Sequence, residues 1–490
     1  MIRFLHQERE VAIEDVPADT TVLDYLREHR GLIGTKEGCA SGDCGACTVV
    51  LAKATEQGLQ YVPINACIAP LGSIHGTQLI SVEDIKEGAT WHPVQRAMIE
   101  CHASQCGFCT PGFVMSLFAL YHADIKGERE EILEALGGNL CRCTGYRPII
   151  DAAEQALAHV EDDKFSRRAQ ATLDQLRALK DTESETAALE STHSHYFRPG
   201  NADHVAQLLA QHPEARLVAG GTDLFLENTQ SLTPLPVLID VSAASDLHHI
   251  DCDTEHMRFG AAVTHRACQA AVITDYPELT ELIERFGSLQ IRSQGTLAGN
   301  IANASPIGDW PPVLLALGGA IELRSSAGTR LVPLDDFFLE YRKTEQQAGE
   351  FVATVILPRR KKNLFLRAYK ISKRFEDDIS SVCGVFALGL EGDRVTEAKV
   401  AFGGMAAIPK RGTSVELALT GLDLVSDSID AAAAAIANDF EPIDDARASA
   451  QYRLTVAARL LTRLQQEYIG DSATRVHPLG ISQAGVSSHG

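Results

Sequence analysis

The sequence has 490 residues, with 44 Lys and Arg against 65 Asp and Glu, which gives a formal net charge of −21. Such an acidic surface repels nucleic acid and anionic membranes, so we expect neither as a partner. The length allows three or four domains, and 45% hydrophobic with 22% charged residues is typical of a soluble globular protein. No apolar run is long enough to span a membrane, and the first residues lack the apolar core of a secretory signal, so we expect a cytoplasmic protein.

Residues 1–85 are predicted to form short strands joined by turns, and residues 86–160 to form helices, because the apolar positions change from strand to helical spacing. In the first part we expect strands at Ile2–His6, Val11–Ile13 and Thr48–Leu51 and a short helix at Val22–Glu28. In the second part the predicted helices are Pro93–Ala103, Gly112–His122, Arg129–Leu136 and Ile149–His159.

The rest of the chain divides by composition. Residues 161–194 are rich in charge, Ser and Thr and have few large apolar residues, which predicts a linker that could hold a short exposed helix. Strands alternate with helices over 195–365, and in 366–475 three strands precede Ala-rich helices. The Gly- and Ser-containing tail after residue 471 is expected to be mobile.

Four cysteines near the N-terminus have a spacing that predicts an iron–sulfur cluster. Cys39, Cys44, Cys47 and Cys67 follow C-x4-C-x2-C-x19-C, the plant-type [2Fe–2S] ferredoxin pattern. Glycines within EGCASGDCGAC allow backbone N–H groups to approach the cluster sulfurs. A zinc ribbon would instead favour paired C-x2-C units.

A second set of four cysteines has a less specific spacing. Cys106, Cys109, Cys141 and Cys143 follow C-x2-C-x31-C-x-C, which by itself fits zinc about as well as an iron–sulfur cluster. Pro111 and Gly112 are typical of a helix start, and the Gly-Gly-Asn turn before Cys141 is typical of a helix end. The four thiols therefore come from the ends of two helices, while Cys101 fits no ligand position.

Two glycine-containing segments in the second half suit a phosphate-bearing cofactor. Leu217–Leu226, LVAGGTDLFL, predicts a strand, a Gly-Gly turn and a helix start whose free N–H groups can bind an anion. Ile291–Ala316 has glycines that let a cofactor lie against the backbone, and Asp309 could bind a sugar hydroxyl. An ordinary strand-to-helix turn and an ordinary Gly/Ala loop remain alternatives, and neither segment is the G-x-G-x-x-G of a nicotinamide fold.

The segments QCGFCTPG and GNLCRCTGYRP, which follow a plant-type ferredoxin spacing, resemble the xanthine dehydrogenase, aldehyde oxidase and carbon monoxide dehydrogenase family. The resemblance implies a multidomain α+β fold. It consists of a β-grasp ferredoxin-type domain (1–85), a four-helix [2Fe–2S] domain (86–160), a linker (161–194), a vanillyl-alcohol-oxidase-type FAD domain (195–365) and a small α+β C-terminal domain (366–475).

The resemblance also implies functional residues. All eight cysteines of the two sets are implied as ligands of two [2Fe–2S] clusters, the second of them nearer a molybdenum cofactor whose pterin Gln105 contacts. The implied FAD contacts are Leu217, Val218, Ala219, Gly220, Gly221, Thr222, Asp223, Leu224, Phe286, Ile291, Gly295, Thr296, Gly299, Asn300, Asn303, Asp309, Phe351, Val352 and Lys370. Asn303 stands where the family often has Thr. Asp377 and Asp378 are implied to lie beside the flavin ring, although such an acidic stretch also fits a solvated loop.

The resemblance implies an electron-transfer subunit. Electrons from a molybdenum subunit that oxidises hypoxanthine and xanthine to urate would pass through both clusters and FAD to NAD+, with a flavin converting single electrons into a hydride. The sequence leaves no room for a molybdenum-binding region, so we expect a large molybdopterin-binding partner in a heterotetramer and no residue of this chain that oxidises the substrate. The alternatives are an aldehyde or N-heterocycle hydroxylase with another acceptor, and a free-standing flavin ferredoxin reductase.

Overall fold

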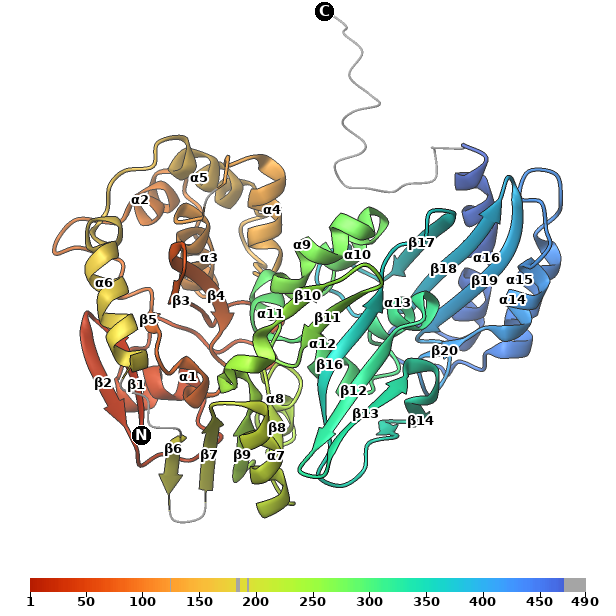
Figure 1. The fold of residues 1–490 in the computed structure, drawn as a ribbon. Helices are drawn as coiled ribbons and strands as arrows, with labels where there is room; N and C mark the ends of the chain where they lie inside the picture. Colours follow the sequence, from red (N-terminus) through yellow and green to blue (C-terminus); the bar gives the residue numbers. More distant parts are fainter. Residues whose placement is uncertain (124, 182–185, 192–193, 471–490) are drawn as a thin grey trace, which may run out of the picture.

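The computed structural model describes residues 1–123, 125–181, 186–191 and 194–470 (Figure 1). The N-terminal domains, red to orange, lie at one side of the molecule, the green and teal central domain follows, and the blue C-terminal domain lies at the other side. The predicted multidomain α+β fold is confirmed. The tail that we expected to be mobile lies outside the described residues.

The first domain is a five-stranded mixed sheet with strand order β2-β1-β5-β3-β4. Its strands are β1 (Ile2–His6), β2 (Arg9–Ile13), β3 (Thr48–Thr55), β4 (Gly58–Asn65) and β5 (Gln78–Ile80). The first two predicted strands pair as an antiparallel hairpin, with Ile2 opposite Ile13. Helix α1 (Val22–Asp24) begins at Thr21, whose hydroxyl accepts the N–H of Asp24, and it continues into a π-helical turn. This helix packs Val22 and Leu23 into the core beneath the sheet.

The second domain contains the four predicted helices. They are α2 (Pro93–Glu100), α3 (Thr110–Tyr121), α4 (Arg129–Gly137) and α5 (Arg147–Ala158). Helix α3 is buried from Gly112 to Tyr121, so it forms the centre of the bundle. The cysteines of the second set lie in the segments before α3 and between α4 and α5.

The segment predicted as a linker has more structure than its composition suggested. It forms the 18-residue helix α6 (Lys164–Asp181) and the strand β6 (Thr186–Ser191). Leu176 and Leu179 recur at helical spacing and pack against Leu5 of the first domain. The few apolar residues thus lie on one face, which is enough to dock the helix even though the segment as a whole is polar.

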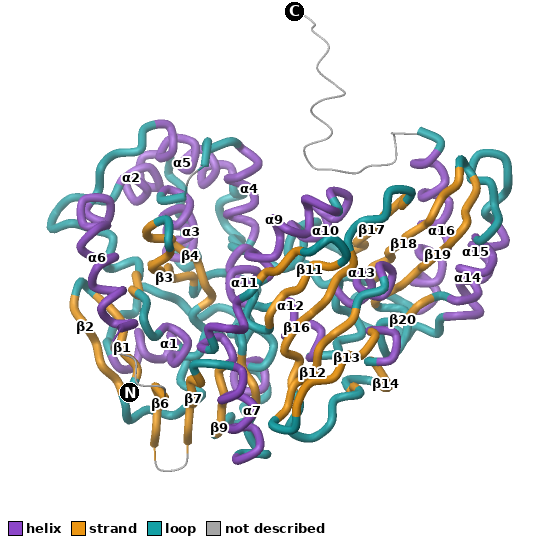
Figure 2. Tube along the Cα trace, viewed as in Figure 1, coloured by secondary structure: helices purple, strands orange, loops and turns teal. Residues whose placement is uncertain are grey.

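The central domain has two sheets with helices between and around them (Figure 2). The first sheet has the order β6-β7-β9-β8, with β7 (Ser194–Pro199), β8 (Arg216–Val218) and β9 (Val237–Asp240) parallel. The second has the order β10-β11-β16-β12-β13 and is antiparallel, with β10 (Ile250–Cys252), β11 (His256–Gly260), β12 (Ala320–Ser325), β13 (Gly328–Pro333) and β16 (Phe351–Pro358).

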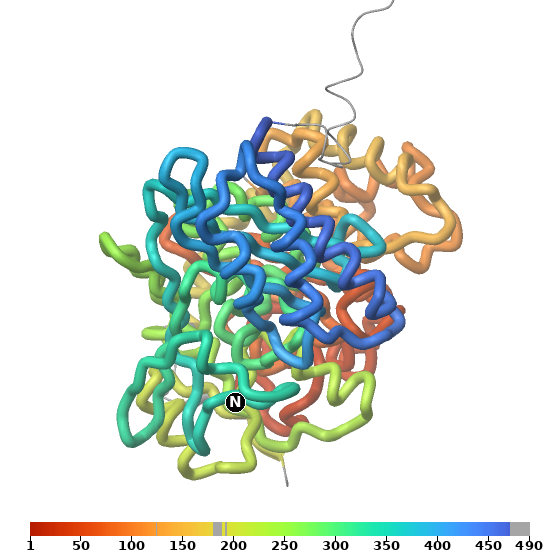
Figure 3. The backbone as a smooth tube through the Cα atoms, turned by 90° about the vertical axis from the view of Figure 1, so that its right-hand side faces the viewer, coloured from red at the N-terminus to blue at the C-terminus, as the bar shows by residue number. Residues whose placement is uncertain are grey.

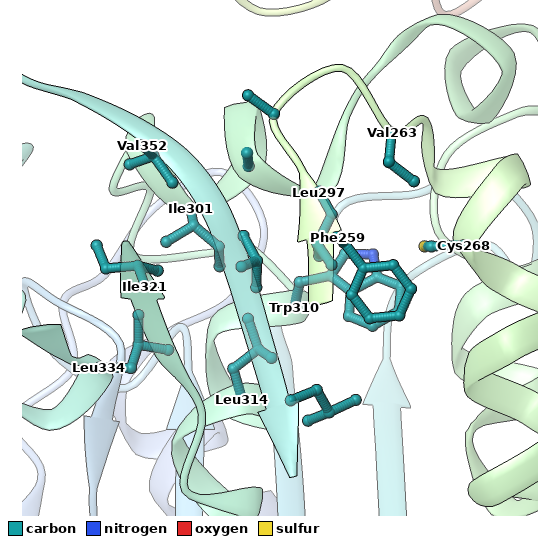
Figure 4. Packing of buried hydrophobic residues seen from close by; sticks show 14 of the residues in the cluster. Phe259, Val263, Cys268, Leu297, Ile301, Trp310, Leu314, Ile321, Leu334 and Val352 are labelled. Carbon is teal, nitrogen blue, oxygen red and sulfur yellow. The ribbon is translucent and has the colours of Figure 1, made fainter. Parts of the chain in front are cut away.

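The helices of the central domain build its core against the antiparallel sheet. They are α7 (Ala202–Gln211), α8 (Phe225–Thr229), α9 (His265–Asp275), α10 (Thr280–Glu284), α11 (Leu289–Gln294), α12 (Leu297–Ala302) and α13 (Trp310–Leu317). Figure 4 shows Leu297 and Trp310 beside Phe259 of the sheet, with Ile301 and Leu314 in the same buried cluster. A short hairpin of β14 (Phe338–Glu340) and β15 (Lys343–Thr344) lies after this core.

The C-terminal domain is a four-stranded antiparallel sheet with helices on one face, seen at the front of Figure 3 in blue. Its elements are β17 (Leu364–Ile371), β18 (Val382–Glu391), β19 (Arg394–Gly403), β20 (Lys410–Arg411), α14 (Thr413–Leu419), α15 (Asp430–Asp439) and α16 (Ala450–Tyr468). The three predicted strands are confirmed, and Ala-rich helices follow them as predicted. Across the described residues, no helix is both long and apolar enough to cross a membrane.

Candidate cofactor sites

The thiols of the first cysteine set converge in the interior of the first domain. The Sγ atoms of Cys47 and Cys67 are 3.3 Å apart, and the thiol of Cys39 is in hydrogen-bond contact with those of Cys44 and Cys67. The N–H groups of Ser41 and Cys44 both donate to Cys39 Sγ, at 3.4 Å each. Four thiols that face one another, with amides directed at sulfur, fit a [2Fe–2S] cluster.

The second set converges at the surface. Cys106 is in hydrogen-bond contact with Cys143, and Cys109 with Cys141. Thr144 donates to Cys141 Sγ from its backbone N–H at 3.4 Å and from its hydroxyl at 3.1 Å. Cys106 and Cys143 are exposed, whereas Cys47 and Cys67 of the first set are buried. The helix ends therefore bring the four thiols together, as the sequence predicted.

The two cysteine sets are joined through their backbones. The N–H of Leu140, which precedes Cys141, donates to the carbonyl of Cys44 at 3.0 Å. The side-chain amide of Asn139 donates to the carbonyl of Gly45 at 3.0 Å. A Cβ on Gly45 or Gly112 would lie within 2.1 Å of a backbone oxygen of the other segment, so glycine is required where the two loops touch.

The central domain holds a cavity of about 840 Å³ that extends to the C-terminal domain. All 19 residues predicted to contact FAD line this cavity, from the 217–224 loop through the 286–309 segment to Phe351, Val352 and Lys370. The structure thus brings together residues more than 150 positions apart. Their individual contacts with FAD remain predictions.

The walls of this cavity are shaped for a dinucleotide. Gly220 packs against Gln294, where a Cβ would lie 2.0 Å from the carbonyl oxygen, and Gly221 has φ of +73°, so only glycine suits this turn. Thr296 caps α12 by accepting the N–H of Gly299 at 3.0 Å. Asn300 has a buried Oδ1 that has no partner among the described residues, which is consistent with a ligand hydroxyl as its donor. These residues fit FAD.

A buried ion pair joins the central and C-terminal domains at the cavity. Lys370 Nζ, on β17, donates to Asp309 Oδ2 at 2.7 Å, and the hydroxyl of Ser380 donates to Asp309 Oδ1 at 2.6 Å. All three side chains line the cavity and are buried. Asp309 is therefore held by protein partners, and Lys370 is held with it.

Sequence reasoning missed His265, which also lines the cavity. This histidine is buried against Phe286, with ring centroids 4.5 Å apart, and its Nδ1 has no partner in the described part of the chain. Burial, assisted by the positive charge of Arg292, lowers the pKa of His265 to about 3, so the ring is neutral. The Thr-His pair before a helix gave no distinct signal, because buried histidines are common.

The first cysteine loop forms part of the same cavity. Ser41, Gly42 and Asp43, which lie between Cys39 and Cys44, are among its lining residues. A Cβ on Gly42 would lie 3.2 Å from Ile291 Cδ1 of the central domain. The buried cysteine set is thus adjacent to the flavin cavity, while the exposed set lies beyond it.

A buried polar network joins the first three domains at this point. Gln290 donates from Nε2 to Thr48 Oγ1 at 3.2 Å, to Ser116 Oγ at 3.1 Å and to Asn139 Oδ1 at 3.3 Å. Its side chain is fully buried, with residues from β3, α3 and the second cysteine loop around it. Gln290 therefore fixes the central domain against both cluster domains.

Outside these sites, two histidines and an aspartate lie close enough together to hold a metal ion, but hydrogen bonds explain their arrangement better. His92, His122 and Asp163 lie together, with both Nε2 atoms within 2.9 Å of Asp163 Oδ2. Nδ1 of His92 accepts the N–H of Val94, so in the neutral ring the proton is on Nε2 and is donated to Asp163. Burial alone would raise the pKa of Asp163, but the hydrogen bonds from His122 and His92 hold it well below its usual range. This triad fastens the start of α6 to α2 and α3.

Comparison with known proteins gives the same assignment, domain by domain. Residues 4–72 match the 2Fe-2S iron-sulfur cluster binding domain and 81–154 the [2Fe-2S] binding domain. Residues 189–360 match the FAD binding domain in molybdopterin dehydrogenase, and 367–468 match the CO dehydrogenase flavoprotein C-terminal domain. The chain belongs to the molybdenum hydroxylase family, of which it carries the iron–sulfur and FAD-binding domains.

Individual proteins are similar to this chain over most of its length. The chain is 33% identical over 452 residues to xanthine dehydrogenase/oxidase of Mus musculus, covering 82% of this chain and 34% of that protein. It is 31% identical over 476 residues to xanthine dehydrogenase of Emericella nidulans, covering 86% of this chain and 35% of that protein. The chain therefore spans about a third of the length of these relatives.

Solved structures resemble about half of the chain. A carbon monoxide dehydrogenase chain from Hydrogenophaga pseudoflava matches with a TM-score of 0.52 and 25% identity, over 55% of this chain and 94% of that one. A quinoline 2-oxidoreductase chain from Pseudomonas putida 86 matches with a TM-score of 0.51 and 26% identity, again over 55% and 94%.

Proposed function

We propose that this chain is the electron-transfer subunit of a xanthine dehydrogenase. Electrons from a separate molybdopterin-binding subunit, which oxidises hypoxanthine and xanthine to urate, would pass through the two [2Fe–2S] clusters and FAD to NAD+. The serial order of the three sites carries this proposal. The exposed cysteine set touches the buried set through Leu140 and Cys44, and the loop of the buried set lines the flavin cavity.

The residues of this chain would hold and insulate the cofactors. The cysteine thiolates bind the clusters, and the amides directed at Cys39 and Cys141 stabilise negative charge on sulfur. The 217–224 loop offers backbone N–H groups to a diphosphate, and the buried Lys370–Asp309 pair fixes the wall between two domains. When bound, FAD supplies the exchange between single electrons and a hydride.

The surface around the exposed cysteines fits a protein partner that holds the molybdenum cofactor. Phe108, Leu140 and Tyr146 beside these cysteines are 48%, 38% and 38% exposed, which is unusual for three large apolar residues in one place. Gln105 is also exposed there, next to Cys106. A partner that covers this surface would bring its cofactor to the second cluster, in a heterotetramer in our proposal.

The test is to co-express this chain with the large molybdopterin-binding chain that we propose as its partner. The two chains are then copurified and assayed with hypoxanthine. We expect a complex with about four irons and one FAD per copy of this chain, which forms urate and reduces NAD+. A complex that forms urate but reduces only artificial dyes would disprove the acceptor. No copurifying chain would disprove the subunit arrangement and favour a free-standing reductase.

The second candidate is an aldehyde or N-heterocycle hydroxylase with another acceptor. It is favoured by the likeness of about half of this chain to quinoline 2-oxidoreductase and carbon monoxide dehydrogenase chains. Comparing rates with hypoxanthine, an aldehyde and quinoline on the same complex distinguishes the two, since the substrate pocket would lie on the partner.

A further inference from the structure

Among the residues that the structure describes, one cation that lines the flavin cavity has no protein partner. Four cationic side chains line it: Arg216, Arg342, Lys370 and Arg447. Arg216 forms two hydrogen bonds with Glu227, at 2.7 and 2.8 Å, Lys370 is paired with Asp309, and Arg342 is 4.0 Å from Asp223. Within the part of the chain that the structure describes, the guanidinium of Arg447 has no hydrogen bond or ion pair.

The backbone that carries Arg447 is nevertheless firmly held. Arg447 lies in the turn before α16, where Asp445 accepts its N–H at 2.8 Å and that of Ala448 at 3.0 Å. The buried Arg453 donates to Asp445 at 2.6 Å and to the carbonyl of Gly404 at 2.9 Å. A fixed turn that presents a free guanidinium is arranged for a ligand rather than for folding.

The turn that carries Arg447 comes from a different domain than the 217–224 loop. Lys373 donates to the carbonyl of Ala446 at 2.8 Å, and Arg453 donates to the carbonyl of Ser381, so the turn is tied to both ends of segment 373–381. That segment and Arg447 come from the C-terminal domain, whereas the 217–224 loop comes from the central domain and packs against Gln294. The 217–224 loop and Arg447 therefore reach the cavity from different domains.

The charge around the cavity indicates what Arg447 would bind. Asp43, Asp223, Glu350, Asp377 and Asp378 line the same cavity, and the chain carries a net charge of −21. An anionic ligand in these surroundings needs a cation that no carboxylate already holds. A guanidinium matches a phosphate with two parallel hydrogen bonds, which makes arginine the best-suited side chain for this task.

We propose that Arg447 binds the diphosphate of the dinucleotide electron acceptor, at the C-terminal-domain wall of the flavin cavity. The inference rests on the proposed function, since it assumes that NAD+ is the acceptor. In the proposed function the 217–224 loop binds the FAD diphosphate, so Arg447 would serve the second dinucleotide.

The test uses the complex of this chain with its molybdenum subunit, in the wild-type form and as Arg447→Gln, Arg447→Lys and Arg459→Gln. Arg459 is a matched control, because it is exposed on α16 of the same domain and does not line the cavity. Binding of NAD+ and of ADP-ribose is measured by calorimetry, together with FAD content and the flavin reduction potential.

We expect Arg447→Gln to weaken dinucleotide binding about tenfold to a hundredfold, the range for a lost charge-assisted hydrogen bond. Arg447→Lys should recover part of the affinity, and Arg459→Gln should bind as the wild type does. FAD content and flavin potential should be unchanged throughout. Wild-type affinity should also fall more steeply with salt than that of Arg447→Gln.

Three results would overturn the inference, and they are distinguishable. If wild type and Arg447→Gln bind NAD+ equally, the role of Arg447 is wrong while the proposed acceptor stands. If Arg447→Gln instead loses FAD or shifts the flavin potential, Arg447 serves the flavin. If the wild type binds neither NAD+ nor ADP-ribose, the proposed acceptor fails and the inference fails with it.

Discussion

The two cysteine sets hold four thiols each, yet the fold surrounds them differently. The first set lies in the core of a mixed sheet domain, with Cys47 and Cys67 buried, and its loop forms a wall of the flavin cavity. The second lies at the ends of two helices, with Cys106 and Cys143 exposed among large apolar side chains. Burial and solvent exposure tune the potential of a cluster, so the surroundings decide the role of each set. One set faces the flavin, and the other is open to a partner.

The comparison predicts that loss of a ligand will have unequal consequences. Cys67→Ser should remove the buried cluster and also destabilise the first domain, because Cys67 belongs to its core. Cys143→Ser should remove only the exposed cluster and leave FAD and the other cluster in place. In each variant the iron content should fall from about four to about two per chain, and electron paramagnetic resonance should show which cluster signal is lost.

The melting temperature distinguishes the two variants, since only Cys67→Ser should lower it strongly. Equal melting temperatures for Cys67→Ser and Cys143→Ser would contradict the expected difference in stability. Survival of both cluster signals in Cys67→Ser would show that this residue is not a ligand.

The contact between the central domain and the two cluster domains can be broken at Gln290. Gln290→Leu removes the donor that Thr48, Ser116 and Asn139 share, and should reduce the free energy of unfolding by about 1–3 kcal/mol. Electron transfer from the clusters to the flavin should also slow, because the central domain is no longer fixed against them. Urea unfolding and rapid-mixing reduction of the flavin measure the two effects.

Gln60→Leu is the control for this variant, since Gln60 is exposed on β4 and lies outside the network. If the two variants are equally stable and transfer electrons equally fast, Gln290 does not position the domains.

A substitution at Gln105 tests the surface around the exposed cysteine set. Gln105→Ala should leave both clusters and FAD in place and slow reduction of the clusters by substrate about fivefold, the factor for one ordinary hydrogen bond. Oxidation of NADH by a dye that accepts electrons at the flavin should be unaffected. Loss of both activities to the same extent would indicate a folding defect instead.

The smallest effect is expected at the flavin end of the buried region. Burial raises the pKa of Asp377 to about 7, so its carboxyl loses its proton near neutral pH. A negative charge beside the flavin disfavours further negative charge on it and keeps its potential low, which favours NAD+ reduction. We expect Asp377→Ala to reduce the ratio of NAD+ to dye reduction about twofold to threefold, and to do so above pH 7 but not at pH 6.

Asp378→Ala should lower the same ratio without this pH dependence. Although burial by itself raises the pKa of Asp378, the hydrogen bond from the N–H of Arg374 lowers it, so Asp378 is ionised throughout this range.

In addition, because the folded-state pKa of Asp377 is above its unfolded value, this carboxyl destabilises the folded chain increasingly as pH rises from about 4 to 7. The melting temperature of Asp377→Ala should therefore exceed that of the wild type most above pH 7. A ratio that does not change in either variant would mean that the segment is only a solvated loop.

The amino-acid sequence by itself predicted the cluster ligands, and it determined the iron–sulfur and FAD-binding domain classes and most of the helices and strands. Cysteine spacing is a local property, since three ligands of the first set lie within nine residues and the second set comes from two helix ends. Apolar periodicity is local as well, and it gave the four helices of the second domain and the three long strands of the C-terminal domain. It failed for α6, where the few leucines on one face gain their stability from docking on another domain.

Only the tertiary structure decided how these parts meet. The hydrogen bond from Leu140 to Cys44, the three partners of Gln290 and the free guanidinium of Arg447 in the flavin cavity join residues far apart in the chain. No periodicity or motif encodes such contacts, because they depend on how separate domains pack and on which charges already have partners. The sequence thus predicts which cofactors the chain can bind, and the packing of the domains determines the order in which electrons can reach them.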